Sequence, residues 1–278
     1  MDFFKCLAYT TVRYIKIDFR YKFQVLIDGL WSVINAIAFG FMGTVFSSAG
    51  LPPGMSLRAF LLFGAFYWTV FTTPYEETVI TIPEEASKGT IGSLLTNRVS
   101  IPALLLGRML SSLLKSTFIA LVFCLPILLF YVQDQLQMIM LEFVPWFVFI
   151  SVFTTLFMLA ITLFVSSYNL IFKRIGVLSR IFLYGLKIAT GMYFPPESLP
   201  TWLAPYVMLL PPVAGLTVLR DLLILGEPAV HLGWMAAEYL NITILSLTIG
   251  TAIMGVVALF ALTLYSNAAR KLGTIEHY

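Results

Sequence analysis

Six apolar stretches, each about as long as a membrane-spanning helix, constrain this sequence more than any other feature. A helix needs roughly 20 predominantly apolar residues to cross about 30 Å of hydrocarbon. Windows of that length predict spans at residues 29–48, 58–82, 102–131, 142–168, 176–193 and 237–266. Only 11% of the residues are charged and the mean hydropathy is +0.92. This composition excludes a soluble enzyme, a disordered chain and a nucleic-acid-binding protein, and we expect an all-α, polytopic membrane protein with six spans.

Basic residues alternate with the predicted spans and so orient the chain. If the N-terminus is cytoplasmic, 15 of the 17 Lys and Arg residues fall on the cytoplasmic side, as the positive-inside rule requires. They precede the first span, flank the second and fourth loops, and follow the last span: Lys5, Arg13, Lys16, Arg20, Lys22, Lys88, Arg98, Arg108, Lys115, Lys173, Arg174, Arg180, Lys187, Arg270 and Lys271. We therefore expect a multi-pass protein of the cell membrane with both termini in the cytoplasm.

The N-terminal segment, residues 1–28, is too charged to span a membrane and too apolar to be a free tail. Apolar residues recur at helical spacing, with basic residues on a neighbouring stripe that can reach lipid phosphates. The apolar positions are Val12, Ile15, Phe19, Phe23 and Leu26, and the basic ones are Arg13, Lys16 and Arg20. We predict an interfacial helix; the alternative is a basic flank that only sets topology. The mixed composition of this segment also argues against a cleavable signal peptide.

Motifs for catalysis are missing from the sequence. It contains no GxxxxGK[ST] phosphate loop, GxSxG elbow or HExxH helix, and His231 and His277 lack the spacing of metal ligands. Cys6 and Cys124 are expected to be inert thiols. We expect no catalytic residue, cofactor or metal in this chain, which forms a single domain over residues 1–278.

The loop after the second predicted span, residues 83–98, has the character of a short amphipathic helix. Pro83 can open a helix, and Glu84 and Glu85 suit the positive end of its dipole. Leu94 and Leu95 supply an apolar edge. A helix of this kind exposed in the cytoplasm is suited to docking against a partner.

Prolines interrupt the segment between the fifth and sixth predicted spans, residues 195–225. Six of them cannot sit in one continuous spanning helix: Pro195, Pro196, Pro200, Pro205, Pro211 and Pro212. Two short re-entrant helices at the outer side are expected instead. Tyr193 and Trp202 would lie at the outer interface, where amphipathic aromatic rings are favoured.

Together these two segments resemble the permease subunits of type-2 ATP-binding-cassette (ABC) exporters. The first matching run is Glu84, Glu85, Gly89, Thr90, Leu94 and Leu95, with Lys88 beside it. The second is Gly191, Phe194, Pro195, Leu199, Pro200, Trp202 and Leu203, followed by Arg220. The chain departs from the family at Ala86 and Ser87, where a basic residue is common, and at Pro211–Pro212, where an Asn-Pro pair is common. These departures bear on which ATPase and substrate subclass the chain serves.

The resemblance implies a coupling helix at residues 83–98 that enters a cleft on a separate ABC ATPase. Two ATPase copies would bind Mg-ATP and act on two permease subunits, a homodimer or a pair of paralogues. Glu84 and Glu85 would be electrostatic contacts to the ATPase, and Leu94 and Leu95 would pack against the permease. The favoured cargo is an amphipathic drug-like molecule or a lipid. The alternatives are export of a lipid-linked polysaccharide of the O-antigen or teichoic acid type, and a non-transporting membrane anchor or assembly factor.

Charges inside the predicted spans give an inference that needs no family. Glu76, Glu77 and Lys187 each lie seven or so residues inside a span, about 10 Å from its cytoplasmic end. Ionisable groups at that depth are costly and are usually paired. We predict that Lys187 pairs with Glu76 or Glu77; the alternative is that all three reach the headgroups. Arg108 and Lys115, seven residues apart, share one face of the third span.

Aromatic residues on the second and fifth spans are candidates for contact with an amphipathic cargo. They are Phe66, Tyr67, Trp68, Phe71, Tyr184 and Met192. Packing within the bundle or against lipid is the alternative for each.

Overall fold

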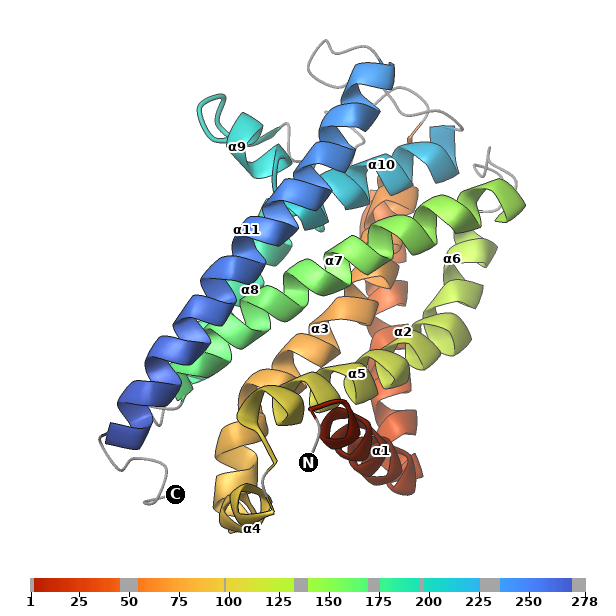
Figure 1. The fold of residues 1–278 in the computed structure, drawn as a ribbon. Helices are drawn as coiled ribbons and strands as arrows, with labels where there is room; N and C mark the ends of the chain where they lie inside the picture. Colours follow the sequence, from red (N-terminus) through yellow and green to blue (C-terminus); the bar gives the residue numbers. More distant parts are fainter. Residues whose placement is uncertain are drawn as a thin grey trace.

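The computed structural model describes residues 3–45, 55–97, 99–132, 140–169, 176–195, 198–225 and 236–271. Every regular element within these ranges is helical, and the helices form one bundle (Figure 1). Helices α1 and α4 and the C-terminal end of α11 lie at one end of the bundle, and α9 and α10 lie at the other (Figure 1).

Four helices in the described ranges are long and apolar enough to cross a membrane. They are α2 (Lys22–Val45), the continuous helix Ile101–Val132, α7 (Met140–Asn169, apolar over Val144–Tyr168) and α11 (Ala236–Lys271, apolar over Asn241–Tyr265). The prediction of a multi-span, all-α membrane protein is confirmed at this level, and four of the six predicted spans meet the criterion.

The second and fifth predicted spans coincide with helices that differ from simple lipid-facing spans. Helix α3 (Leu57–Ser87) is 31 residues long but carries charged and hydroxyl side chains. It contacts α2, α5, α7, α8 and α10, so it is the central helix of the bundle and has little need of a lipophilic surface. Helix α8 (Gly176–Ala189) has 14 residues, or about 21 Å, shorter than the hydrocarbon thickness.

The N-terminal segment forms a separate helix, α1 (Phe3–Arg20), and the chain changes direction at Tyr21. The helix of the first predicted span, α2, therefore begins at Lys22 rather than at residue 29, and Gln24 and Asp28 lie in its first turns. Cys6, Thr10, Tyr14 and Asp18 form the buried face of α1. The apolar positions Val12 and Phe19 lie on its exposed side, which is the side expected to meet lipid.

The helix of the third predicted span contains a π-helical turn. Helix α5 (Ile101–Ile119) passes through η1 (Ala120–Cys124) into α6 (Leu125–Val132) without a break. A π turn inserts one extra residue into a helix and shifts the register of the residues that follow.

The expected coupling helix is shorter than predicted and begins later. Pro83 does not open a helix, since α3 runs through both Pro74 and Pro83 to Ser87. The chain then turns at Gly89, whose φ of 68° favours glycine, and forms α4 (Ile91–Thr96). The packing that surrounds α3 maintains the helix although each proline removes one backbone hydrogen bond.

Two short helices precede the last span, as the prolines predict. Helix α9 (Ala204–Met208) is followed by α10 (Pro211–Leu225), whose first two residues are the Pro211–Pro212 pair. Proline is favoured in the first turn of a helix because its missing N–H would have no partner there.

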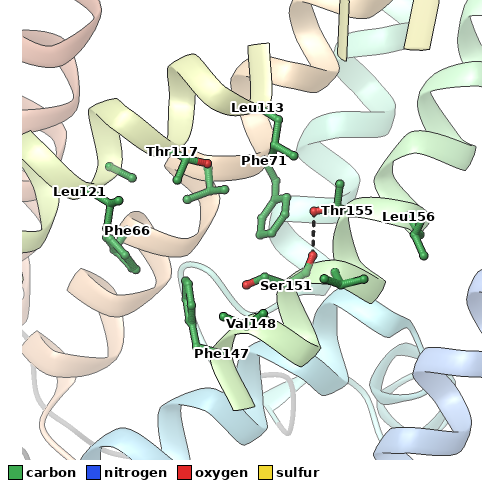
Figure 2. Close-up of a pocket in the computed structure, with 13 residues that line it drawn as sticks. Phe66, Phe71, Leu113, Thr117, Leu121, Phe147, Val148, Ser151, Thr155 and Leu156 are labelled. Atoms are coloured by element: carbon green, nitrogen blue, oxygen red, sulfur yellow. Dashed lines mark hydrogen bonds between the residues drawn. The ribbon is translucent and has the colours of Figure 1, made fainter. Parts of the chain in front are cut away.

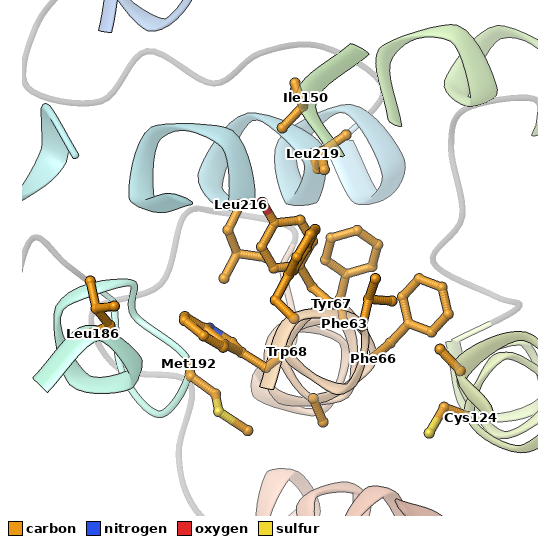
Figure 3. Packing of buried hydrophobic residues seen from close by; sticks show 14 of the residues in the cluster. Phe63, Phe66, Tyr67, Trp68, Cys124, Ile150, Leu186, Met192, Leu216 and Leu219 are labelled. Carbon is orange, nitrogen blue, oxygen red and sulfur yellow. The ribbon is translucent and has the colours of Figure 1, made fainter. Parts of the chain in front are cut away.

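Aromatic residues of α3 fill the centre of the bundle. Figure 3 shows Phe63 and Tyr67 directed toward Leu216 and Leu219 of α10, and Trp68 directed toward Leu186 and Met192. Tyr67 donates or accepts a 2.6 Å hydrogen bond with Thr154, and the Trp68 indole N–H donates to Thr190 over 2.9 Å. Both rings thus pack in the core with their polar atoms satisfied.

Candidate functional site: an anchored turn, a buried ion-pair cluster and an apolar pocket

The turn between α3 and α4 is the most exposed part of the predicted coupling segment. Lys88, Gly92 and Ser93 are exposed, and a Cβ built on Gly89 or Gly92 would meet nothing within 4 Å. Glu84 and Lys88 form a 2.6 Å ion pair at i,i+4, with side chains 44% and 57% exposed. This surface is open to a partner.

Glu85 lies on the other side of the same turn and is occupied within the protein. Its carboxylate accepts a 2.9 Å bond from Arg13 and a 2.8 Å bond from the Tyr14 hydroxyl, both on α1. Thr90 donates a further hydrogen bond to it. The side chain of Glu85 is 5% exposed, so its expected role as a contact to an ATPase is reassigned to holding α1 against the turn.

We call the group formed by Arg13, Tyr14, Glu85 and Thr90 the α1 anchor. Its hydrogen bonds favour the charged form of the Glu85 carboxyl. Burial alone would raise the pKa of the Glu85 carboxyl, but the hydrogen bonds from Arg13, Thr90 and Tyr14 lower this pKa below its usual value. Burial, with the Glu85 charge, raises the pKa of the Tyr14 hydroxyl, which therefore stays a neutral donor.

The structure describes the surroundings of only one of the two leucines in the coupling segment. Leu94 is buried in a cluster with Cys6 and Tyr14 of α1 and Ala103 and Leu104 of α5. Leu94 thus packs against helices of its own chain, as expected. The surroundings of the Leu95 side chain lie outside the described residues.

A second polar group joins the four helices α1, α2, α3 and α5. We call it the ion-pair cluster; its charged members are Asp18, Asp28, Glu77, Arg108 and Lys115. Arg108 of α5 donates to Asp18 of α1 over 2.8 Å and lies 3.0 Å from Glu77 of α3. Lys115 of α5 contacts Glu77 as well and lies 3.4 Å from Asp28 of α2.

Two serines complete the cluster. Ser111 donates to Asp18 over 2.7 Å, and Ser112 donates to Glu77. Positions 108, 111, 112 and 115 fall on one face of α5. This face carries all the cationic and hydroxyl groups of the cluster, and the three neighbouring helices each supply a carboxylate.

The predicted intramembrane pair is not formed as proposed. Glu77 is bound by Arg108 and Lys115, and no ion pair within 4.0 Å connects Lys187 to Glu76 or Glu77 in the described part of the chain. Lys187 and Glu76 are close enough for their charges to interact. The described contact of the Lys187 ammonium is with an aromatic ring instead, since it lies 5.5 Å from the ring centre of Tyr184. Arg108 and Lys115 share a face as predicted, and their partners were missed because those partners come from α1, α2 and α3.

The motif at the opposite end centres on Arg220 of α10. This side chain is 2% exposed. It donates a 2.8 Å hydrogen bond to the Gly191 carbonyl, and its guanidinium carbon lies 3.6 Å from the ring centre of Phe60. Gly64 makes room for it, because a Cβ there would lie 2.3 Å from Arg220 Nη2.

The other motif residues surround this centre unequally. Pro195 is buried, Phe194 and Leu199 are half-buried, and Pro200 and Trp202 are exposed. The exposed fraction of Trp202 is 70%, consistent with an aromatic ring at a membrane interface.

The aromatic residues proposed for a pathway separate into three groups. Tyr67, Trp68 and Met192 pack in the core and do not line the pocket described below, so their contact with a cargo stays a prediction. Tyr184 is exposed on α8. Phe66 and Phe71 line a pocket of about 330 Å³ between α3, α5 with η1, and α7 (Figure 2).

Among the described residues, no three or more His, Cys, Asp or Glu side chains lie together so that they could hold a metal ion. Cys6 and Cys124 are both free and buried.

No curated protein matches the chain. A family model described as "ABC-2 type transporter" matches residues 2–224, from α1 through the two clusters and Arg220 to the end of α10. Because this match spans most of the chain, the protein belongs to the ABC-2 type transporter family.

Proposed function

We propose that this chain is the membrane-spanning half of an exporter, and that the turn between α3 and α4 receives the motion of its ATPase. Family membership makes the chain a permease of an ABC transporter, with an ABC ATPase as partner. The observation that carries the proposal is the two-sided turn: one side is exposed at Glu84 and Lys88, and the other is bonded to α1 through Glu85.

In this proposal the end of the bundle that carries α1 and α4 faces the cytoplasm. The distribution of Lys and Arg supports that orientation. The transporter would contain two permease subunits and two ATPase subunits, and the ATPase would bind Mg-ATP. A push on the turn would pass to α3 directly and to α1 through Glu85.

The cargo we favour is an amphipathic drug-like molecule or a lipid. The described spans present apolar and aromatic surfaces, and the pocket beside α3 contains no charged residue. Export of a lipid-linked polysaccharide remains the second candidate within transport, and a membrane anchor without a pathway is the candidate from another class.

An exchange of the two exposed charges tests the coupling role. The double variant Glu84→Lys/Lys88→Glu keeps the i,i+4 pair and the net charge but reverses the field that the partner meets. We expect insertion and thermal stability to stay unchanged, while ATP-dependent export of an amphipathic dye or a fluorescent phospholipid from proteoliposomes falls about tenfold. The matched control is Glu76→Gln, which changes an exposed carboxyl on the same helix away from the turn.

Three results would count against the proposal. Full export activity in the exchanged variant would remove the turn from the coupling path. Absence of any ATPase from the purified complex would favour the anchor. Export of a lipid-linked glycan, with no export of dye or phospholipid, would favour the polysaccharide alternative.

A further inference from the structure

The pocket between α3, α5 with η1, and α7 opens sideways from the bundle. Phe66 and Phe71 form its buried floor, whereas Leu121, Val148 and Val152 on its rim are each about half exposed. The rim residues belong to helices that qualify as membrane spans. The opening therefore faces the hydrocarbon of the bilayer.

The lining is almost entirely apolar, with three hydroxyl groups. Ten of the 13 lining residues are aliphatic or aromatic, and the others are Thr117, Ser151 and Thr155. The Thr155 hydroxyl is already used, since it donates to the Ser151 carbonyl over 2.7 Å (Figure 2). The Ser151 hydroxyl oxygen is buried and has no hydrogen-bond partner in the structure.

An unpartnered buried hydroxyl in an apolar pocket points to a ligand with a polar atom. Leaving such a group without a hydrogen bond is unfavourable, and buried polar groups nearly always have one. A plain hydrocarbon chain cannot supply it. A charged group is equally unsuitable, because none of the 13 lining residues carries a charge to neutralise it.

The size of the pocket limits the ligand further. Its volume of about 330 Å³ is roughly twice that of the ~150 Å³ protein cavity known to bind benzene, and it lies at the lower end of the range for ligand pockets. A single ring system or a chain of about ten carbon atoms fits this volume.

The helix geometry beside the pocket is unusual in a way that agrees with a binding role. Ala120 and Leu121, both lining residues, belong to the π-helical turn η1. π-helical turns occur frequently at functional sites because the extra residue redirects the side chains around it.

We propose that this pocket binds a small uncharged molecule from the bilayer core, largely apolar and carrying one hydroxyl or carbonyl oxygen that bonds to Ser151. The apolar body of the ligand lies on Phe66 and Phe71. This inference does not rest on transport, since binding at the site is measured without ATP.

Photolabelling of the full chain in phosphatidylcholine nanodiscs tests the proposal. The probe is a diazirine-bearing decanol, compared with the matching diazirine-bearing decane and decanoate. We expect the alcohol to label segments 113–121 and 147–156 about fivefold more than the alkane, the ratio expected from one net hydrogen bond. The carboxylate should label them least, and unlabelled decanol should compete.

Three variants make the result specific to the pocket. Ser151→Ala should lower labelling by the alcohol to the level of the alkane and leave labelling by the alkane unchanged. Val152→Trp should block both probes by filling the mouth of the pocket. Leu114→Trp, at an exposed position of α5 that does not line the pocket, should change neither.

Equal labelling by alcohol and alkane would overturn the proposal and identify the pocket as a seat for a lipid tail. So would labelling that unlabelled decanol cannot reduce, because the probes would then report only their concentration in the bilayer.

Discussion

The two ends of the bundle bury basic side chains in different ways. At the end with α1 and α4, Arg108 and Lys115 meet three carboxylates from three other helices. At the end with α10, Arg220 donates to the Gly191 carbonyl and lies against the Phe60 ring. The first arrangement connects helices that are far apart in sequence through paired charges. The second connects α10 to the segment after α8 through the Gly191 oxygen, and to the start of α3 through the ring of Phe60.

This difference sets how each end responds to the loss of one group. Removing one member of a buried ion pair leaves its partner's charge uncompensated, which costs more than the pair itself contributes. The two contacts described for Arg220 are to neutral groups, a carbonyl and a ring, so losing the cation from them leaves no uncompensated charge on either one. Cys6 lies in the α1 packing and Cys124 in the central core, and both are buried. Their reactivity toward a thiol reagent therefore reports separately on the α1 packing and on the central core.

The largest expected effect comes from Glu77, the carboxylate shared by Arg108 and Lys115. Glu77→Gln should destabilise the protein by about 3 kcal/mol, because two buried cations lose their common partner. Thermal unfolding in detergent, followed through labelling of Cys6 and Cys124, measures this. Glu76→Gln is the matched control, since Glu76 is adjacent and exposed. Equal unfolding temperatures for the two variants would contradict a central role for Glu77.

A smaller effect is expected at the other end. Arg220→Met keeps an apolar stem of similar length and removes the guanidinium. We expect a loss of about 2 kcal/mol from one charge-assisted hydrogen bond and one cation–π contact. The same thiol assay applies, with the labelling of Cys6 at low temperature unchanged. A loss larger than that of Glu77→Gln would reverse the comparison between the two ends.

The smallest effect concerns pH at the α1 anchor. The pKa of folded Glu85 is below its usual value, so its contribution is complete above the unfolded pKa of about 4.3 and is lost as the pH falls through the lower folded pKa. The loss should be of the order of 1 kcal/mol, because a protonated carboxyl still makes hydrogen bonds. Labelling by a dipyridyl disulfide, which reacts with thiols in acid, should show the ratio of Cys6 to Cys124 labelling constant from pH 8 to 5 and rising below pH 4. A ratio that rises already at pH 6 would contradict the lowered pKa.

Local patterns in the sequence were enough to predict where most of the helices lie, but they could not predict which polar side chains meet between helices. Apolar stretches about 20 residues long located the long spanning helices, and the prolines located α9 and α10, because both signals depend only on neighbours along the chain. Pro83 was misassigned since packing around α3 outweighs the local preference to begin a helix there. Glu85 looked like a surface residue because its partners Arg13 and Tyr14 are some 70 positions away. The same holds for Arg108 and Lys115, whose shared face was visible while their carboxylates were not.

Gly107 of α5 has a mechanical consequence. A Cβ at this position would lie 2.2 Å from Thr10 Oγ1 and 2.9 Å from the Thr11 nitrogen, and Thr10 donates a 2.9 Å hydrogen bond to the Ala103 carbonyl. The backbone of α5 at Gly107 therefore lies directly against Thr10 and the Thr11 backbone of α1, with no α5 side chain between the two helices. Such a contact resists rolling and sliding, so α1 and the first half of the third span move as one rigid body. A force applied to α1 is thus passed to α5, which continues into a helix long and apolar enough to cross a membrane.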